Sequence, residues 1–350
     1  MTRTANFSRL LTALRCGEPD YVPLVELGIH PSIKSAFLGR PVTCLMDEID
    51  FAAAAGYDYV KLQPIINMNP ANIKPKGEAA SHKTAPSTDR VWASEHDGII
   101  QSMEDFERYI WPKIEDISYS RFEQIAPLLP EGMKVIGQYG DIFTLVWEMM
   151  GFENFSMALF MDTALVEALF ETIGSLIFSM YENMAEIDCV GALWFSDDIA
   201  YASGLMISPD ALRQYLFPWI KKMGDVARAH DLPFMYHSDG VLWDVFDDLI
   251  AAGVNAIHPI EPKAMDILEV KKRVAGKLCV IGNIDLAYTL TRGTPEETAE
   301  EVKTRIRQIA PGGGYCLGSS NSVPEYVKPE NFRAMVETCK TIGKYPINIA

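Results

Sequence analysis

Two short motifs carry side chains whose spacing suits metal binding or proton transfer. In the run PFMYHSDG, His237 and Asp239 are two residues apart, so both side chains can face the same side of an extended chain. Glu26 lies inside the otherwise apolar run VPLVELG, where an unpaired carboxylate is costly to bury. We predict that Glu26, His237 and Asp239 are catalytic and converge on a metal ion such as zinc. The alternatives are a structural histidine and a salt-bridged glutamate.

A second acidic pair follows an apolar run in WFSDDIAYASG. Adjacent residues of a strand face opposite ways, so only one of the two carboxylates is needed in a pocket, and the other can cap a helix. We predict that Asp197 is catalytic and that Asp198 contacts substrate. Cys316 is a candidate for a further zinc ligand, but it precedes the end of its run by several residues. A buried core cysteine is the expected alternative there.

Alternation of short apolar runs with amphipathic stretches predicts parallel βαβ units. A doubly wound sheet would favour a glycine-rich turn after the first strand, and ELGIHPS has none. Eight runs favour an α/β fold of the closed (β/α)₈ TIM-barrel type. The predicted strands are 21–27, 57–63, 134–139, 192–197, 233–238, 254–259, 278–283 and 314–320.

The length of 350 residues fits one TIM-barrel domain over 1–350 with an insertion. Residues 65–129 separate the second and third predicted strands by more than an ordinary crossover, which predicts a lid or cover over the barrel mouth. Within it, VWASEHDGII suggests a β-hairpin. The alternative is a surface segment without a functional role. Helices are expected at 7–15, 209–229, 242–252, 265–274 and 294–309.

Catalytic residues of such barrels lie at the carboxyl ends of the strands, and every predicted strand ends in polar residues. Trp147 and Met150, in TLVWEMMGF, suggest an apolar wall that suits a planar ligand, with core packing as the alternative. The predicted substrate-binding residues are Gln138, Tyr139, Trp147, Met150, Asp198, His258, Asn283 and Asn321.

Composition excludes several classes of protein. The formal charge is 31 − 47 = −16, which argues against a nucleic-acid partner. The six cysteines are scattered without a CxxC pair, so reduced thiols and a cytoplasmic location are expected. The first residues lack the apolar segment of a secretory signal, and no membrane association is expected. A homodimer is left open.

Several motifs together resemble the uroporphyrinogen decarboxylase superfamily. They are RLLTALRCGEPDYVPLVELG, SDDIAYASGLMISPDALRQYLFPWIKKM, HSDG, VIGNID and GGGYCLGSSNSVPEYVKPENF, and they occur in the order of that superfamily along the whole chain. The resemblance implies a (β/α)₈ barrel. Decarboxylases of this superfamily carry arginines just after the first strand, whereas this chain reads VELGIHPS there, which disfavours that activity.

The other branch of the superfamily contains corrinoid-dependent methyltransferases, several of which bind zinc through a His-x-Cys pair and a later cysteine. This chain has His237-x-Asp239, and Ser319 or Ser320 at the later position, which argues against activation of coenzyme M. The pattern resembles methyltransferases that demethylate aryl methyl ethers. It implies a corrinoid (cobalamin) on a partner carrier protein, because no Asp-x-His-x-x-Gly motif is present. The alternatives are a decarboxylase and a non-catalytic small-molecule-binding barrel.

Overall fold

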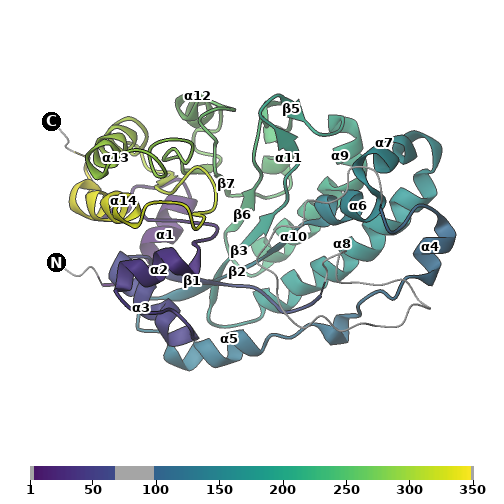
Figure 1. Ribbon diagram of the computed structural model, residues 1–350, viewed down its shortest axis with the longest axis horizontal. Coiled ribbons are helices and arrows are strands. Elements are labelled where there is room, and N and C mark those ends of the chain that lie inside the picture. The colour runs from purple at the N-terminus through teal and green to yellow at the C-terminus, as the bar shows by residue number, and fades with distance from the viewer. Residues whose placement is uncertain (1–3, 68–97, 348–350) are drawn as a thin grey trace.

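A computed structural model describes residues 4–67 and 98–347. Its centre is a curved sheet of seven parallel strands in the order β1-β2-β3-β6-β7-β8-β9, with helices packed outside it (Figure 1). This confirms the predicted α/β barrel class. The strands are β1 (Tyr59–Leu62), β2 (Lys134–Gly140), β3 (Val190–Ser196), β6 (Phe234–His237), β7 (Ala256–His258), β8 (Cys279–Ile281) and β9 (Tyr315–Cys316).

The first of the eight predicted strands, at 21–27, lies between β9 and β1, where the eighth strand of a barrel is expected. It does not form a regular strand. Val25 N donates to Leu317 O at 2.9 Å and Leu317 N donates to Pro23 O at 2.8 Å, so the segment runs parallel to the end of β9. On its other side, the Tyr59 hydroxyl on β1 bonds both the N–H and the carbonyl of Glu26. Pro23 has no N–H to donate, which disfavours a regular ladder here. The side chain of Tyr59 therefore connects this segment to β1 in place of backbone hydrogen bonds.

The first segment must approach the chain closely on its other side, just after β9. A Cβ added to Gly318 would lie 2.1 Å from the carbonyl oxygen of Val25, so only glycine fits there. The two described termini lie at the same end of the molecule, beside α1, α13 and α14 (Figure 1).

The helices follow the alternation of the sequence, and their ends carry the expected signals. Thr294 forms a capping box with Glu297 at the start of α13, and Pro295 occupies its first turn. The predicted helix 209–229 is divided into two at Leu216, because Pro218 begins a new helix and cannot donate to the preceding turn. The helices are α1 (Phe7–Leu14), α2 (Pro31–Leu38), α3 (Leu45–Ala55), α4 (Met103–Arg108), α5 (Ser120–Ile125), α6 (Ile142–Met150), α7 (Phe152–Met161), α8 (Thr163–Ala185), α9 (Pro209–Tyr215), α10 (Phe217–Ala229), α11 (Phe246–Ala251), α12 (Ile267–Arg273), α13 (Pro295–Ile309) and α14 (Pro329–Ile342), with 3₁₀ turns at Ile114–Asp116, Ala126–Leu128 and Trp243–Val245.

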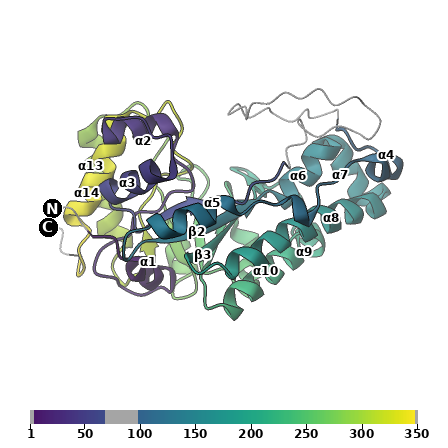
Figure 2. The ribbon, with the colours of Figure 1, turned by 90° about the horizontal axis from the view of Figure 1, so that it is seen from below.

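The described part of the long insertion runs along the outside of the barrel. Ile65 pairs with Ser118 in an antiparallel bridge, and Ile100 N donates to the carbonyl of Met149 in α6. Helix α4 lies near α7 and α8, at the end of the molecule away from the termini (Figure 2). Most of the predicted hairpin falls on residues 91–97, outside the described residues. That this insertion covers the mouth stays a prediction.

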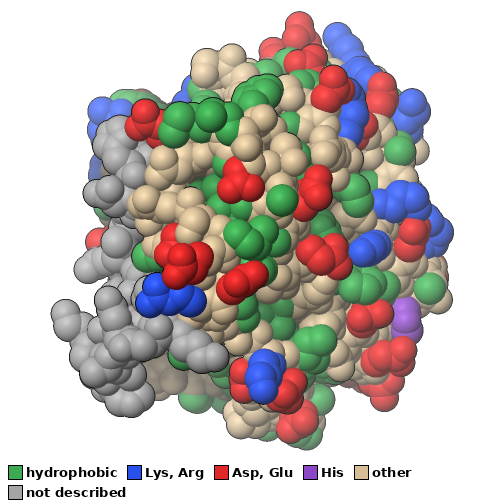
Figure 3. Space-filling view, turned by 90° about the vertical axis from the view of Figure 1, so that its right-hand side faces the viewer, with side chains coloured by type: hydrophobic (Ala, Val, Ile, Leu, Met, Phe, Trp, Pro, Cys, Tyr) green, Lys and Arg blue, Asp and Glu red, His purple; other side chains and the backbone are tan. Residues whose placement is uncertain are grey.

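Helix α8 is the one described helix that is long and apolar enough to cross a membrane by length and composition. More than half of its apolar window, 56%, is buried inside the fold. It packs against α6, α7, α10 and the sheet, which is the arrangement of a core helix. The face at the α4 and α7 end carries scattered acidic, basic and hydrophobic side chains (Figure 3), without a large basic surface of the kind that binds nucleic acid.

Candidate functional site

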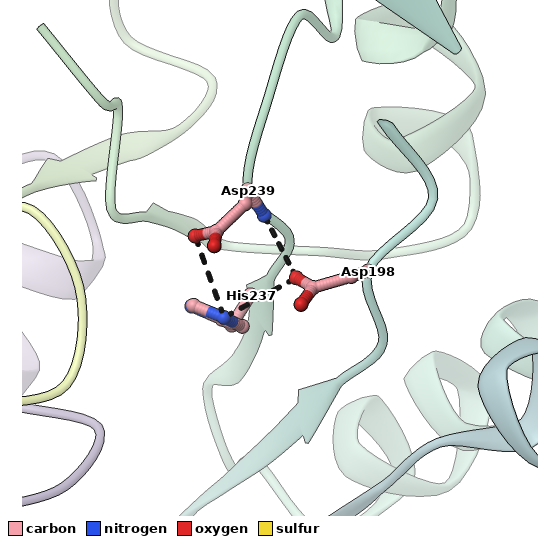
Figure 4. A group of neighbouring side chains, drawn as sticks. All are labelled: Asp198, His237 and Asp239. Atoms are coloured by element: carbon pink, nitrogen blue, oxygen red, sulfur yellow. Dashed lines mark hydrogen bonds and ion pairs between the residues drawn. The ribbon is translucent and has the colours of Figure 1, made fainter. Parts of the chain in front are cut away.

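Three polar side chains converge at the carboxyl ends of β3 and β6. His237 ends β6, and its register partner on β3 is Ser196, two residues before Asp198. His237 Nε2 lies 3.5 Å from Asp198 Oδ1 and 3.9 Å from Asp239 Oδ1, and the backbone N–H of Asp239 donates to Asp198 Oδ1 at 2.9 Å (Figure 4). We call Asp198, His237 and Asp239 the His–Asp group. Parallel strands bring these residues together because their carboxyl ends meet at one edge of the sheet.

The environment of Asp239 changes its proton affinity. Burial, reinforced by repulsion from Asp198 and Glu261, raises the pKa of Asp239 to about 7, against a hydrogen bond from Asn321 that lowers it. Asn321 Nδ2 donates to Asp239 Oδ2 at 2.6 Å. The other oxygen, Oδ1, is buried and has no hydrogen-bond partner among the described residues. It therefore faces the interior of the group with an acceptor to spare.

A second histidine lies directly behind His237. The Nδ1 atoms of His237 and His258 are 2.7 Å apart, on register partners of β6 and β7. His258 is fully buried, and burial together with His237 and Lys61 holds its pKa well below the ordinary value. Its ring meets the Trp194 ring edge-on at 5.3 Å between centroids. His258 was predicted to bind substrate, but a side chain with no exposed surface positions His237 instead.

The donor atoms of the His–Asp group fit a divalent metal ion such as zinc. One imidazole nitrogen and two carboxylate oxygens lie within 4.8 Å of one another. Ligand atoms around a tetrahedral zinc ion are separated by about 3.3–3.5 Å, given bonds of about 2.0–2.1 Å, so small movements would suffice. The unpartnered Oδ1 of Asp239 is the acceptor that such an ion would satisfy. Three protein ligands leave an open position, as in catalytic zinc sites.

The predicted ligand set is corrected at Glu26, which is not a member of this group. Both Glu26 carboxyl oxygens bond Ser319: its N–H donates to Oε1 at 2.8 Å, and its Oγ lies 2.5 Å from Oε2. Burial raises the pKa of Glu26 to about 8 although both Ser319 contacts lower it. The Ser319 hydroxyl also contacts the carbonyl oxygen of Asn321, and one hydroxyl hydrogen cannot serve two acceptors. A protonated Glu26 resolves this conflict by donating to Ser319.

Asp197 is likewise not placed for the predicted catalytic role. Its Oδ2 accepts from Phe143 N at 2.6 Å, and its Oδ1 accepts from Thr144 N at 3.0 Å and from Thr144 Oγ1 at 2.8 Å. These are the first N–H groups of α6, so Asp197 caps that helix from the end of β3. Asp198, the next residue, faces the mouth instead. The alternation expected for the pair is therefore present, and Asp197 is the residue that caps a helix.

A polar row on β1, β2 and β3 continues the site around the barrel. Gln138 Nε2 donates to Ser196 Oγ at 2.7 Å, and Gln138 Oε1 accepts from Lys61 Nζ at 3.1 Å. Gln63 Nε2 bonds the same Gln138 oxygen. Lys61 was missed by the sequence analysis, although a lysine in the alternating run YDYVKLQ was the available signal. Burial lowers the pKa of Lys61 to about 8.

The remaining predicted binders lie away from the His–Asp group. Gly137 faces Met184 of α8, so Tyr139, two residues further on, lies on the helix-facing side of β2. Met150 is buried in the core, and half-buried Trp147 packs edge-on against Phe152 at 5.7 Å. These positions favour packing over an open apolar wall.

Asn283 and Cys316 are both interior. Asn283 is buried and donates to the Ile260 carbonyl at 2.8 Å, which supports a turn. Cys316 is fully buried, with its sulfur 3.8 Å from that of Cys279, as expected for a core cysteine. All six cysteines are free. The His–Asp group therefore contains no thiol.

Comparison with protein families gives a match to the model described as Uroporphyrinogen decarboxylase (URO-D), over residues 94–342. The matched range includes the whole His–Asp group. It covers well over half of the chain.

Individual relatives and a solved structure agree with that match. The chain is 25% identical over 258 residues to the methylcobamide:CoM methyltransferase MtbA of Methanosarcina acetivorans, covering 69% of each protein. It is 26% identical over 133 residues to uroporphyrinogen decarboxylase of Pseudoalteromonas translucida, covering 37% of this chain and 36% of that protein. A methyltransferase structure from Methanosarcina mazei has a TM-score of 0.69 at 17% identity and covers 97% of this chain and 99% of that one, which shows a shared fold. The longer of the two sequence matches is with a methyltransferase, which supports the predicted branch.

Proposed function

Because this chain belongs to the uroporphyrinogen decarboxylase (URO-D) family, we propose that it is a methyltransferase that moves a methyl group from a small methylated compound to the cobalt of a corrinoid on a partner protein. The donor that we propose is an aryl methyl ether, so the reaction is an O-demethylation in the cytoplasm. The observation that carries the proposal is the convergence of Asp198, His237 and Asp239 at the barrel mouth. Similarity to a methylcobamide:CoM methyltransferase supports the corrinoid partner.

The chemistry explains why such a group is needed. The methyl carbon of an aryl ether is a poor electrophile, because its leaving group is a phenolate. The protein must therefore stabilise or protonate the ether oxygen as the carbon–oxygen bond breaks. In this proposal the one imidazole and two carboxylates of the His–Asp group act on the ether oxygen of a donor bound at the mouth. Asp239, with its pKa near 7, can hold a proton there.

A zinc ion is the alternative source of the same assistance. His237, Asp198 and Asp239 would hold it, and the bound ion would act as a Lewis acid toward the ether oxygen. In either case His258 holds the His237 ring through the contact between their Nδ1 atoms. Asn321 holds the Asp239 carboxylate by donating a hydrogen bond to its Oδ2 atom.

A second candidate is methylation of a thiol, the activity named for the Methanosarcina acetivorans relative. Thiol activation by zinc is favoured by thiolate ligands, whereas the His–Asp group offers only nitrogen and oxygen. Ether demethylation is therefore our first choice.

The test mixes the purified chain, a methoxylated aromatic compound and a reduced corrinoid carrier protein, and follows methylcobalt absorbance. We expect His237→Ala to lower the rate by at least about 10²-fold, the lower range for loss of a general acid or base. The control is His230→Ala, which removes an imidazole from the exposed end of α10 and should leave the rate unchanged.

Two further measurements separate the candidates. Metal analysis, followed by methyl-transfer assays after chelation and after re-addition of zinc, decides whether a proton or a metal ion assists the ether oxygen. A parallel assay with methylcobalamin and coenzyme M measures thiol methylation. Thiol methylation without ether demethylation would overturn the first proposal in favour of the second, and neither activity would contradict both.

A further inference from the structure

Lys61 is an interior cation that the proposed chemistry does not use. It lies on β1, and its Nζ donates to the Gln138 side-chain oxygen, on the same side of the sheet as Ser196. Lys61 also lines a pocket between the first segment, α2, α3 and β1, together with Ile29 and Phe51, and the residue is partly exposed.

The charge of Lys61 has no counter-ion within ion-pair distance among the described residues. By contrast, Lys34 in the same pocket pairs with Glu48 at 2.6 Å. An ammonium group has three N–H donors, and the described contacts of Lys61 use one, toward the neutral amide of Gln138. Glu48 and Asp141 attract the Lys61 charge only at longer range, and a partly buried charge without an ion-pair partner is unfavourable for folding. The presence of such a charge on Lys61, inside the barrel, indicates that this lysine binds an anionic ligand.

Lys61 belongs to the same polar layer as the His–Asp group. The layer runs from Lys61 through Gln138 to Ser196, whose register partner is His237, and on to His258. It thus crosses five neighbouring strands of the sheet. The lowering of the His258 pKa by Lys61 agrees with this proximity.

The two ends of this layer carry opposite charge. The acidic end contains Asp198 and Asp239, with Glu261 close enough to raise the pKa of Asp239. The other end carries Lys61. An anionic group on a ligand is repelled at the first end and attracted at the second, so a ligand with one anionic end binds in a single orientation.

We propose that Lys61 binds a carboxylate on the methyl donor, so that the donor class is a methoxylated aromatic acid with its methoxy group directed toward the His–Asp group. This inference rests on the proposed function and specifies its substrate. Lys61 supplies binding and orientation, and the bond that breaks remains the methyl carbon–oxygen bond at the other end of the layer.

The test measures binding by calorimetry, with 4-methoxybenzoate and its neutral analogue 4-methoxybenzamide as ligands. We expect the wild-type chain to bind the acid at least about tenfold more tightly, as for a charge-assisted hydrogen bond in a partly buried site. Lys61→Met should abolish this preference by weakening the acid alone, and Lys61→Arg should restore part of it. Lys272→Met is the matched control, because it removes an exposed lysine from α12, and it should change acid binding by less than about twofold.

Methyl-transfer kinetics then separate binding from catalysis. Lys61→Met should raise KM for the acid and leave kcat within about twofold. Equal weakening of acid and amide, no preference in the wild type, or a kcat loss with both donors would overturn the proposal. If the acid preference depends on Lys61 but no methyl reaches a corrinoid carrier, the anionic subsite stands and the proposed function fails. If methoxybenzamide is demethylated without any acid preference, the proposed function stands and the subsite fails.

Discussion

His237 and His258 face each other through their Nδ1 atoms, 2.7 Å apart, on neighbouring strands. One hydrogen must lie between these two nitrogens, so one ring donates from Nδ1 and the other accepts at Nδ1. The tautomer of one ring therefore determines the tautomer of the other. Since burial disfavours a charge on His258, this residue remains neutral. The contact therefore orients the His237 ring, whose Nε2 faces Asp198 and Asp239.

The first prediction concerns this contact. His258→Phe keeps the ring volume beside Trp194 but removes the nitrogen, and we expect it to lower both zinc affinity and methyl transfer by about 10–100-fold, as for other partners of metal-binding histidines. His258→Asn places an amide near the original Nδ1 position and should retain most of both. Zinc affinity is measured by competition with a chelating dye. Identical behaviour of the two variants would assign His258 to packing alone.

The second prediction compares two adjacent carboxylates. Asp197→Asn removes an acceptor from the start of α6 and should lower the free energy of unfolding by about 1–3 kcal/mol, measured by urea denaturation. Asp198→Asn should leave that stability nearly unchanged, because this side chain is partly exposed, yet it should weaken zinc binding and slow methyl transfer. The reverse pattern would return the catalytic role to Asp197.

The third prediction concerns Glu26, whose folded-state pKa of about 8 lies above its ordinary value of 4.5. The folded protein then binds a proton that the unfolded chain has released between these values. Glu26 therefore makes its full contribution to the free energy of unfolding below about pH 4.5. This contribution is lost as the pH rises toward 8. Glu26→Gln should remove this part of the decline, because the amide can donate to the Ser319 hydroxyl and accept from its N–H.

Denaturation of both proteins between pH 5 and 8.5 checks this expectation, with zinc affinity as a second readout. An unchanged pH profile in Glu26→Gln would mean that the wild-type carboxyl is ionised throughout. A large loss of zinc affinity would restore Glu26 as a ligand.

The fourth prediction concerns Lys61 and pH. Its pKa of about 8 reflects burial and repulsion from Lys34, opposed by attraction to Glu48 and Asp141, and His258 is the neighbouring imidazole. The ammonium form binds an anion, so affinity for 4-methoxybenzoate should fall as the pH rises above about 8. Affinity for 4-methoxybenzamide should not change in step. Calorimetry at pH 7 and pH 9.5 measures both, and a parallel decline of the two would contradict the proposed subsite.

Much of the fold could be predicted because local patterns and global packing agree. Seven of the eight predicted runs form strands of the parallel sheet, since β-branched and aromatic runs between helical stretches have few other compact arrangements. The remaining run, at 21–27, lies in the expected place but pairs with its neighbours through isolated bridges. Pro23 was visible in advance, but the role of the Tyr59 hydroxyl was not, because that bond joins residues 33 positions apart.

The spacing of His237 and Asp239 was enough to place them on one side of the chain, since two residues restore the same face of an extended strand. The same alternation required Asp197 and Asp198 to diverge. Which of the two faces the mouth depends on the N–H groups of Phe143 and Thr144, more than 50 residues away. Glu26 was correctly recognised as a buried carboxylate, but its partner Ser319 lies 293 residues along the chain. Short-range periodicity specifies faces and strand ends, whereas the partner of each buried charge is decided only when the barrel closes and brings distant strands into register.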